Sequence, residues 1–284
     1  MSARRPRLLY QALTYAGLAV TVAVVLYPVL LVCKASLTPG YQPSLPASPV
    51  PHHLSTEHFR ELFGAEGPHG ELLFLHHAFN SIVVALLTTV VGVFLSCTAA
   101  YALSRFRFPV RKASLSAFLV VQMFPATLLL IPLYVVLEKL GLLNSIAGLV
   151  LVYSTTAIPF CVWTLKGYFD SLPRELEEAA RIDGASQWMI FRKIILPLAR
   201  PGIAVTALFS FMTAWNEFIM ASTFMTNQDK YTLPVLIQQS VTEHSANYGL
   251  FAAGAVVTSI PVMVAFYVLQ RYLVGGLTAG AVKG

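Results

Sequence analysis

The chain has 284 residues, of which 56% are hydrophobic and 11% charged, and its formal net charge is +6 at pH 7. Soluble domains carry about 25% charged residues, so this composition excludes an ordinary soluble protein, which needs more charge to cover its surface in water. The basic excess does not indicate nucleic-acid binding, because the basic residues lie in short loops without interleaved stacking aromatics.

Six stretches of the chain are apolar and long enough to cross a membrane. Each exceeds the roughly 20 residues that a helix needs to span a bilayer core of about 30 Å. The expected spans are residues 8–33, 77–103, 113–137, 145–165, 202–225 and 249–272. The sequence therefore predicts an all-α polytopic membrane protein with six transmembrane helices.

The segments around these spans complete the predicted organisation. Residues 1–7 are a cytoplasmic N-terminus whose basic residues resemble the start of a secretory signal. The apolar run that follows is too long for one and lacks a convincing cleavage site, so we interpret it as an uncleaved anchor. Residues 34–76 form an extracytoplasmic segment, residues 77–273 a five-helix core with a cytoplasmic loop at 166–200, and residues 274–284 a cytoplasmic tail.

Prolines inside the predicted spans should kink or locally unwind the helices, because each removes a backbone hydrogen bond. These kinks are either packing irregularities or hinges of a moving gate, and the sequence does not decide between the two. The prolines are Pro28, Pro125, Pro132, Pro159 and Pro261.

The distribution of basic residues predicts the orientation of the chain. Six spans place both termini on one face, and fifteen of the 19 lysines and arginines fall on that face, against four on the other. Basic loops stay in the cytoplasm, so both termini and the 166–200 loop are expected there, in a plasma membrane. The four on the outer face are Lys34, Arg60, Lys139 and Lys230.

Nothing in the sequence predicts a metal or catalytic site. The three cysteines lie in or at the edges of apolar spans and are interpreted as small packing residues. Each histidine pair, His52-His53 and His76-His77, consists of adjacent residues that point to different sides of an element, which does not suit one metal ion. No Gly-Lys dipeptide occurs, which excludes a phosphate-binding P-loop and predicts that the chain itself binds no ATP or other cofactor.

The loop 166–200 carries the strongest local signals. Ser171 and Pro173 predict the start of a short helix, and acidic residues after them favour its N-terminal end. Gly184 is placed to end that helix in a left-handed conformation, and Ser186 to cap the next one. Such a short helix, presented below the membrane, suits docking into a groove of a partner; the alternative is a connector that contacts nothing.

The same loop resembles a known family signature. Glu178-Ala179-Ala180, Gly184, and then Ile194, Leu196 and Pro197 are similar to the "EAA" signature of binding-protein-dependent ABC importer permeases. The resemblance implies a type I importer permease fold and a coupling helix seated in a cleft of a cytoplasmic ATPase dimer. The docking residues that it implies are Glu178, Ala179, Ala180, Arg181, Asp183 and Gly184.

Two further segments resemble carbohydrate importer permeases, above all the smaller permease of maltose/maltodextrin importers. They are Trp215-Asn216-Glu217-Phe218 and the tail 273–284. The resemblance implies transport of maltodextrin or a related oligosaccharide, a second permease, an extracytoplasmic sugar-binding protein, and a tail that contacts the ATPases. For that tail contact we single out Gly276, Thr278 and Lys283.

Glu217 is the only acidic residue inside a span. A charge at mid-membrane costs about 2.5–3.5 kcal/mol, so its side chain should face the bundle or a wet cavity. Trp215, Asn216 and Glu217 are therefore candidates for the translocation path, and a hydrogen-bonded packing role for Glu217 is the alternative.

Two other functional classes fit the sequence less well than an importer permease does. An ion-driven secondary transporter usually has ionisable residues in several spans and internal repeats, whereas this chain has one such residue and no convincing repeat. A membrane enzyme would need a clustered nucleophile, base or metal set, and none is found. An importer for another carbohydrate stays open.

Overall fold

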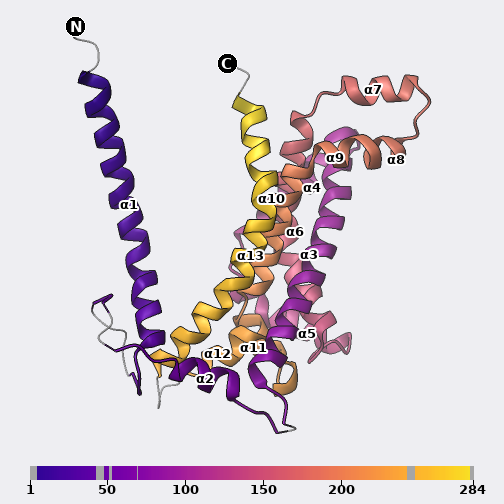
Figure 1. Ribbon diagram of the computed structural model, residues 1–284. Helices are drawn as coiled ribbons and strands as arrows, with labels where there is room; N and C mark the ends of the chain where they lie inside the picture. The colour runs from indigo at the N-terminus through magenta and orange to yellow at the C-terminus, as the bar shows by residue number, and fades with distance from the viewer. Residues whose placement is uncertain (1–4, 43–47, 51–52, 69, 242–246, 282–284) are drawn as a thin grey trace. The chain divides into compact units, whose positions relative to one another are not determined.

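The computed structural model describes residues 5–42, 48–50, 53–68, 70–241 and 247–281, and these are almost entirely helical (Figure 1). The helices, in chain order, are α1 (Arg5–Leu37), α2 (Glu57–Gly64), α3 (Leu73–Arg105), α4 (Arg111–Met123), η1 (Ala126–Leu129), α5 (Leu130–Lys139), α6 (Ile146–Ser171), α7 (Glu175–Ile182), α8 (Gln187–Ile190), the π-helical η2 (Phe191–Ile195), α9 (Leu196–Leu198), α10 (Arg200–Trp215), α11 (Ile219–Phe224), η3 (Gln228–Lys230), α12 (Leu233–Gln238) and α13 (Tyr248–Ala281). The predicted all-α class is confirmed.

Within the described part of the chain, four helices are long and apolar enough to cross a membrane without a break, namely α1, α3, α6 and α13. Two further candidates are bent pairs, α4 with the helix that follows it, and the helical stretch 187–198 with α10. The first pair bends by 98° and the second by 77°. Counting each bent pair as one span gives six candidates, which is the number that the sequence predicts. The predicted bounds 202–225 of the fifth span are wrong, because the second pair covers residues 187–215 and the helix stops at 216–218 before α11 begins at Ile219.

The bend after α4 has a local cause in the sequence. Phe124 is extended, with φ −73° and ψ 127°, because the ring of Pro125 disfavours the helical conformation in the residue before it. The helix therefore ends at Met123 and resumes as η1 at Ala126. Pro28, Pro159 and Pro261, in contrast, lie inside continuous helices.

The chain divides into two compact units, residues 1–74 with 236–260, and residues 75–235 with 261–284. In the first unit, Gln42 joins the end of α1 to the start of α13. Its side-chain amide donates to the carbonyls of Ala35 and Thr38, both at 2.8 Å, and its backbone carbonyl accepts from the backbone amide of Tyr248 at 2.9 Å. None of the most apolar stretch of α1 is buried within the described residues, as expected for a helix that lies in lipid or against another protein.

The second unit is built around α6 and α10, which pack closely because small residues face large ones. A side chain at Gly202 would meet the ring of Tyr168 at 2.8 Å, so only glycine allows this approach. Cys161 is buried against Ser210, with 3.4 Å between Sγ and Oγ. The cysteines are therefore packing residues here, as predicted; Cys97 is also buried, and Cys33 is half-buried.

Candidate functional site

The short helices α7, α8 and α9 lie at one end of the bundle made by α3, α6 and α10 (Figure 1). The sequence places the start of α7 at Ser171, and this is wrong. Ser171 is the last residue of α6, and its hydroxyl donates to the carbonyl of Tyr168 at 2.7 Å. Because Pro173 holds Leu172 in an extended conformation, the helix breaks there and α7 begins at Glu175, with Arg174 in the capping position.

The turn between α7 and α8 has the predicted geometry. Gly184 has φ +82°, a left-handed conformation that residues with a Cβ rarely adopt. The amide of Ala185 donates to the carbonyl of Ala180 at 2.9 Å, which closes the end of α7. The hydroxyl of Ser186 accepts from the amide of Met189 at 3.3 Å and so caps α8.

The outward face of α7 and α8 is exposed and partly apolar. Ile182 is 88% exposed, and Leu176 and Met189 also lie at the surface. Among the predicted docking residues, Glu178, Ala179, Arg181, Asp183 and Gly184 are exposed, whereas Ala180 is buried against the bundle. Exposed apolar residues next to charged ones are typical of a surface that contacts another protein.

The inward face of α7 carries a residue that the sequence analysis did not single out. Glu177 is 2% exposed, and its carboxylate accepts from the Nε of Arg105 at 2.5 Å and from the hydroxyl of Tyr101 at 3.2 Å. Arg181 approaches the same carboxylate at 3.7 Å. The sequence signal is that Glu177 precedes the buried Ala180 by three residues, which places both on one helical face.

The ion pair continues into a wider polar network. Nη1 of Arg105 donates to the hydroxyl of Ser104 at 3.1 Å, and Nη2 donates to the carbonyl of Leu172 at 3.3 Å. Ser104 in turn donates to Asp170 at 2.6 Å. Gln187 of α8 donates to the hydroxyl of Tyr101. The ends of α3 and α6 are thus joined to α7 and α8 by side-chain hydrogen bonds.

The predicted translocation residues lie where α10 ends, and they face different surroundings. Trp215 is 3% exposed and stacks on Phe211, with 5.8 Å between the ring centroids. Asn216 is exposed. Glu217 accepts from the amides of Met220 and Ala221 at 2.9 and 3.0 Å and from the hydroxyl of Tyr153 at 3.0 Å. Its carboxylate therefore holds the first turn of α11 and a buried tyrosine.

Of the predicted tail residues, Gly276 and Thr278 belong to the last turns of α13, because this helix continues to Ala281. The side chain of Thr278 and the whole of Lys283 lie outside the described residues.

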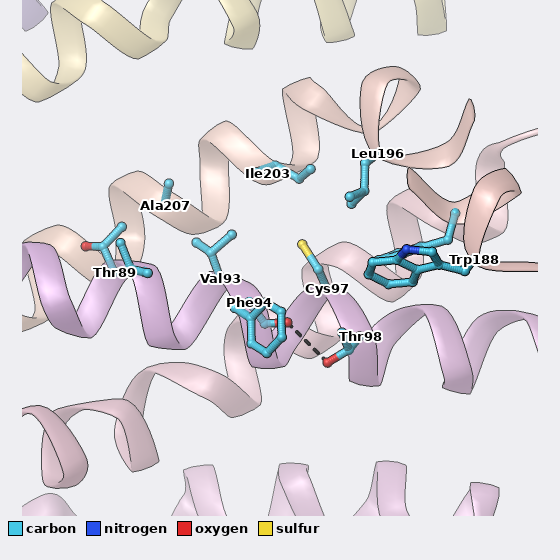
Figure 2. A pocket seen from close by; sticks show the side chains of 11 residues that line it. Thr89, Val93, Phe94, Cys97, Thr98, Trp188, Leu196, Ile203 and Ala207 are labelled. Carbon is cyan, nitrogen blue, oxygen red and sulfur yellow. Dashed lines mark hydrogen bonds between the residues drawn. The ribbon is translucent and has the colours of Figure 1, made fainter. Parts of the chain in front are cut away.

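A cavity of about 440 Å³ lies between α3 and the segment from α8 to α10 (Figure 2). Its lining is almost entirely apolar and includes Val93, Phe94, Trp188 and Ile203. The hydroxyl of Thr98 is engaged with the carbonyl of Phe94 at 3.1 Å, as Figure 2 shows. Such a lining suits an apolar chain or helix and offers little to the hydroxyl groups of a sugar.

Comparison with known proteins defines the class of this chain. Residues 92–278 match the family of binding-protein-dependent transport system inner membrane components. The chain belongs to this family, and it is a transport permease rather than an enzyme.

Two relatives and one solved structure illustrate the match. The chain is 40% identical over 279 residues to the galactooligosaccharides transport system permease protein GanQ of Bacillus subtilis strain 168, covering 98% of this chain and 96% of GanQ. It is 39% identical over 288 residues to the maltose/maltodextrin transport system permease protein MalG of Salmonella typhimurium, covering 96% and 95%. A chain in the crystal structure of a bacterial ABC transporter involved in the import of alginate matches with a TM-score of 0.76 at 23% identity, covering 96% of this chain and 99% of that one. The predicted resemblance and the ABC importer permease fold are confirmed.

Proposed function

We propose that this chain is one of two permease subunits of an ATP-driven importer for oligosaccharides. Maltodextrins are the first candidate substrate and galactooligosaccharides the second, since relatives that match nearly the whole chain carry these names. The chain forms a translocation path together with the second permease, and an extracytoplasmic binding protein delivers the sugar.

The observation that carries this proposal is the outward face of α7 and α8. Helix α7 is held on one face by a buried ion pair and presents Ile182, which is 88% exposed, on the other, so it has the form of a docking element. Because the sequence contains no P-loop, the ATP must be hydrolysed by the partner that docks there. Glu178, Ala179 and Gly184 are exposed at this surface, and their role in binding the ATPase, which the signature implies, is part of the proposal.

The proposed orientation places this face in the cytoplasm of a bacterial cell. It follows from the fifteen basic residues that share a side with the 166–200 loop. The same reasoning places both termini inside and the region around α2 outside.

The substrate is tested by uptake of radiolabelled maltotriose and galactotriose in the host, with the gene for this chain deleted and then restored. We expect deletion to reduce the uptake of maltotriose to background, and the restored gene to recover it. Loss of galactotriose uptake alone would assign the second candidate. If neither sugar's uptake depends on the gene, both candidate substrates are wrong.

A further inference from the structure

Helix α7 has few contacts through which a displacement could be transmitted to the membrane spans. Its connections to α6 and α8 are the short irregular segments 172–174 and 183–186, and the second contains the left-handed Gly184. Among its own residues only Glu177 and Ala180 are buried. Since Ala180 contributes one methyl group, the side chain that fixes α7 to the bundle is that of Glu177.

Glu177 is fixed to α3 more firmly than an ordinary surface ion pair would be. The side chains of Arg105 and Glu177 are 4% and 3% exposed. Solvent screens such a pair weakly, and loss of either partner leaves an unpaired buried charge, so the two do not separate readily. The pair between Lys166 and Asp170 differs, because the side chain of Asp170 is 40% exposed.

The other two nitrogens of the Arg105 guanidinium, Nη1 and Nη2, also donate hydrogen bonds. Its guanidinium donates to Ser104 and to the carbonyl of Leu172, where α6 ends. Planar donors held in three directions leave the arginine little rotational freedom. A displacement of α7 is therefore transmitted to the end of α3 through the ion pair, without a prior change in the conformation of segments 172–174 and 183–186.

We propose that Arg105 and Glu177 are a positioning pair that transmits the movement of the docking helix α7 to the span α3, so that ATP hydrolysis by the partner drives opening of the path. This rests on the proposed function, in that an ATPase must dock on the outward face of α7. The pair acts through the position of the two helices.

The test uses the importer complex purified from its host through a tag on this chain and reconstituted in liposomes. The variants are Arg105→Gln, Glu177→Gln and the double variant, and the probe is whichever of maltotriose and galactotriose the wild-type complex transports. The matched control is Arg107→Gln, the same change two residues along at an exposed position. The readout is the ratio of sugar transported to ATP hydrolysed, which a loss of folded complex alone does not change.

We expect the double variant to retain its ATPase and to hydrolyse ATP, while the sugar transported per ATP falls about two- to thirtyfold, the range for residues that couple two sites. The double variant is decisive because it leaves no unpaired buried charge and so assembles even where the single variants do not. Arg107→Gln is expected to keep the wild-type ratio.

Two results would overturn the proposal: a double variant with the wild-type ratio, or a double variant that no longer holds the ATPase. A wild-type complex that contains no ATPase, or that transports neither sugar, would instead contradict the proposed function. The two failures are therefore distinguishable.

Discussion

Replacement of Ile182 by Asp is expected to release the ATPase from the membrane complex. Ile182 is 88% exposed, so the permease itself tolerates the change. Its burial in a partner's cleft would contribute about 2 kcal/mol, and this loss alone weakens the complex about thirtyfold. The new carboxylate weakens it further, because it would be buried there without a partner.

The measurement is the amount of ATPase that co-purifies with the tagged chain in mild detergent. Leu54→Asp is the matched control, since it places the same charge at an exposed aliphatic position of the other unit. If the Ile182→Asp variant co-purifies with as much ATPase as the wild type and the control variant do, this face of α7 is not the docking surface.

Replacement of Glu217 by Ala is expected to lower the free energy of unfolding by about 3 kcal/mol. The carboxylate accepts two amides of α11 and the hydroxyl of Tyr153, which is fully buried and would be left without this acceptor. Glu217→Gln keeps one carbonyl oxygen and should lose less. Thermal unfolding of the purified complex in detergent measures the difference.

The control for this experiment is Glu138→Ala, the same change at an exposed position of α5, which should leave the unfolding temperature unchanged. The result also decides between the two interpretations of Glu217. A Glu217→Ala complex that is as stable as wild type but transports no sugar would contradict the packing role and support a residue of the translocation path.

Much of the fold follows from the sequence because membrane spans and helix ends have strong local causes. Charge-free runs of about 20 residues predict the spans. Gly184 and Ser186 predict the turn between α7 and α8 because each meets a specific backbone requirement. The predicted start of α7 at Ser171 was wrong because a serine can either cap a new helix or end the preceding one. Only the effect of Pro173 on the conformation of Leu172 distinguishes the two cases.

The exposed short helix on the outward side of the candidate site could be predicted from the sequence, whereas the contacts on its inward side could not. The signature residues from Glu178 to Gly184 are close together in sequence, so one short sequence motif includes all of them. Arg105 and Glu177 are separated by 72 residues, and only the packing of α3 against α7 brings their side chains together. The partner of Glu217 could not be predicted from the sequence for the same reason, since Tyr153 belongs to α6 and lies 64 residues before it.

The most direct test of the account is the energy source of transport. The purified complex, reconstituted in liposomes with ATP on the side of α7, is given labelled maltotriose and the binding protein on the opposite side. We predict accumulation of sugar that requires ATP hydrolysis and is unchanged by ionophores that collapse ion gradients. Accumulation that an ion gradient drives without ATP would contradict the importer account and identify a secondary transporter.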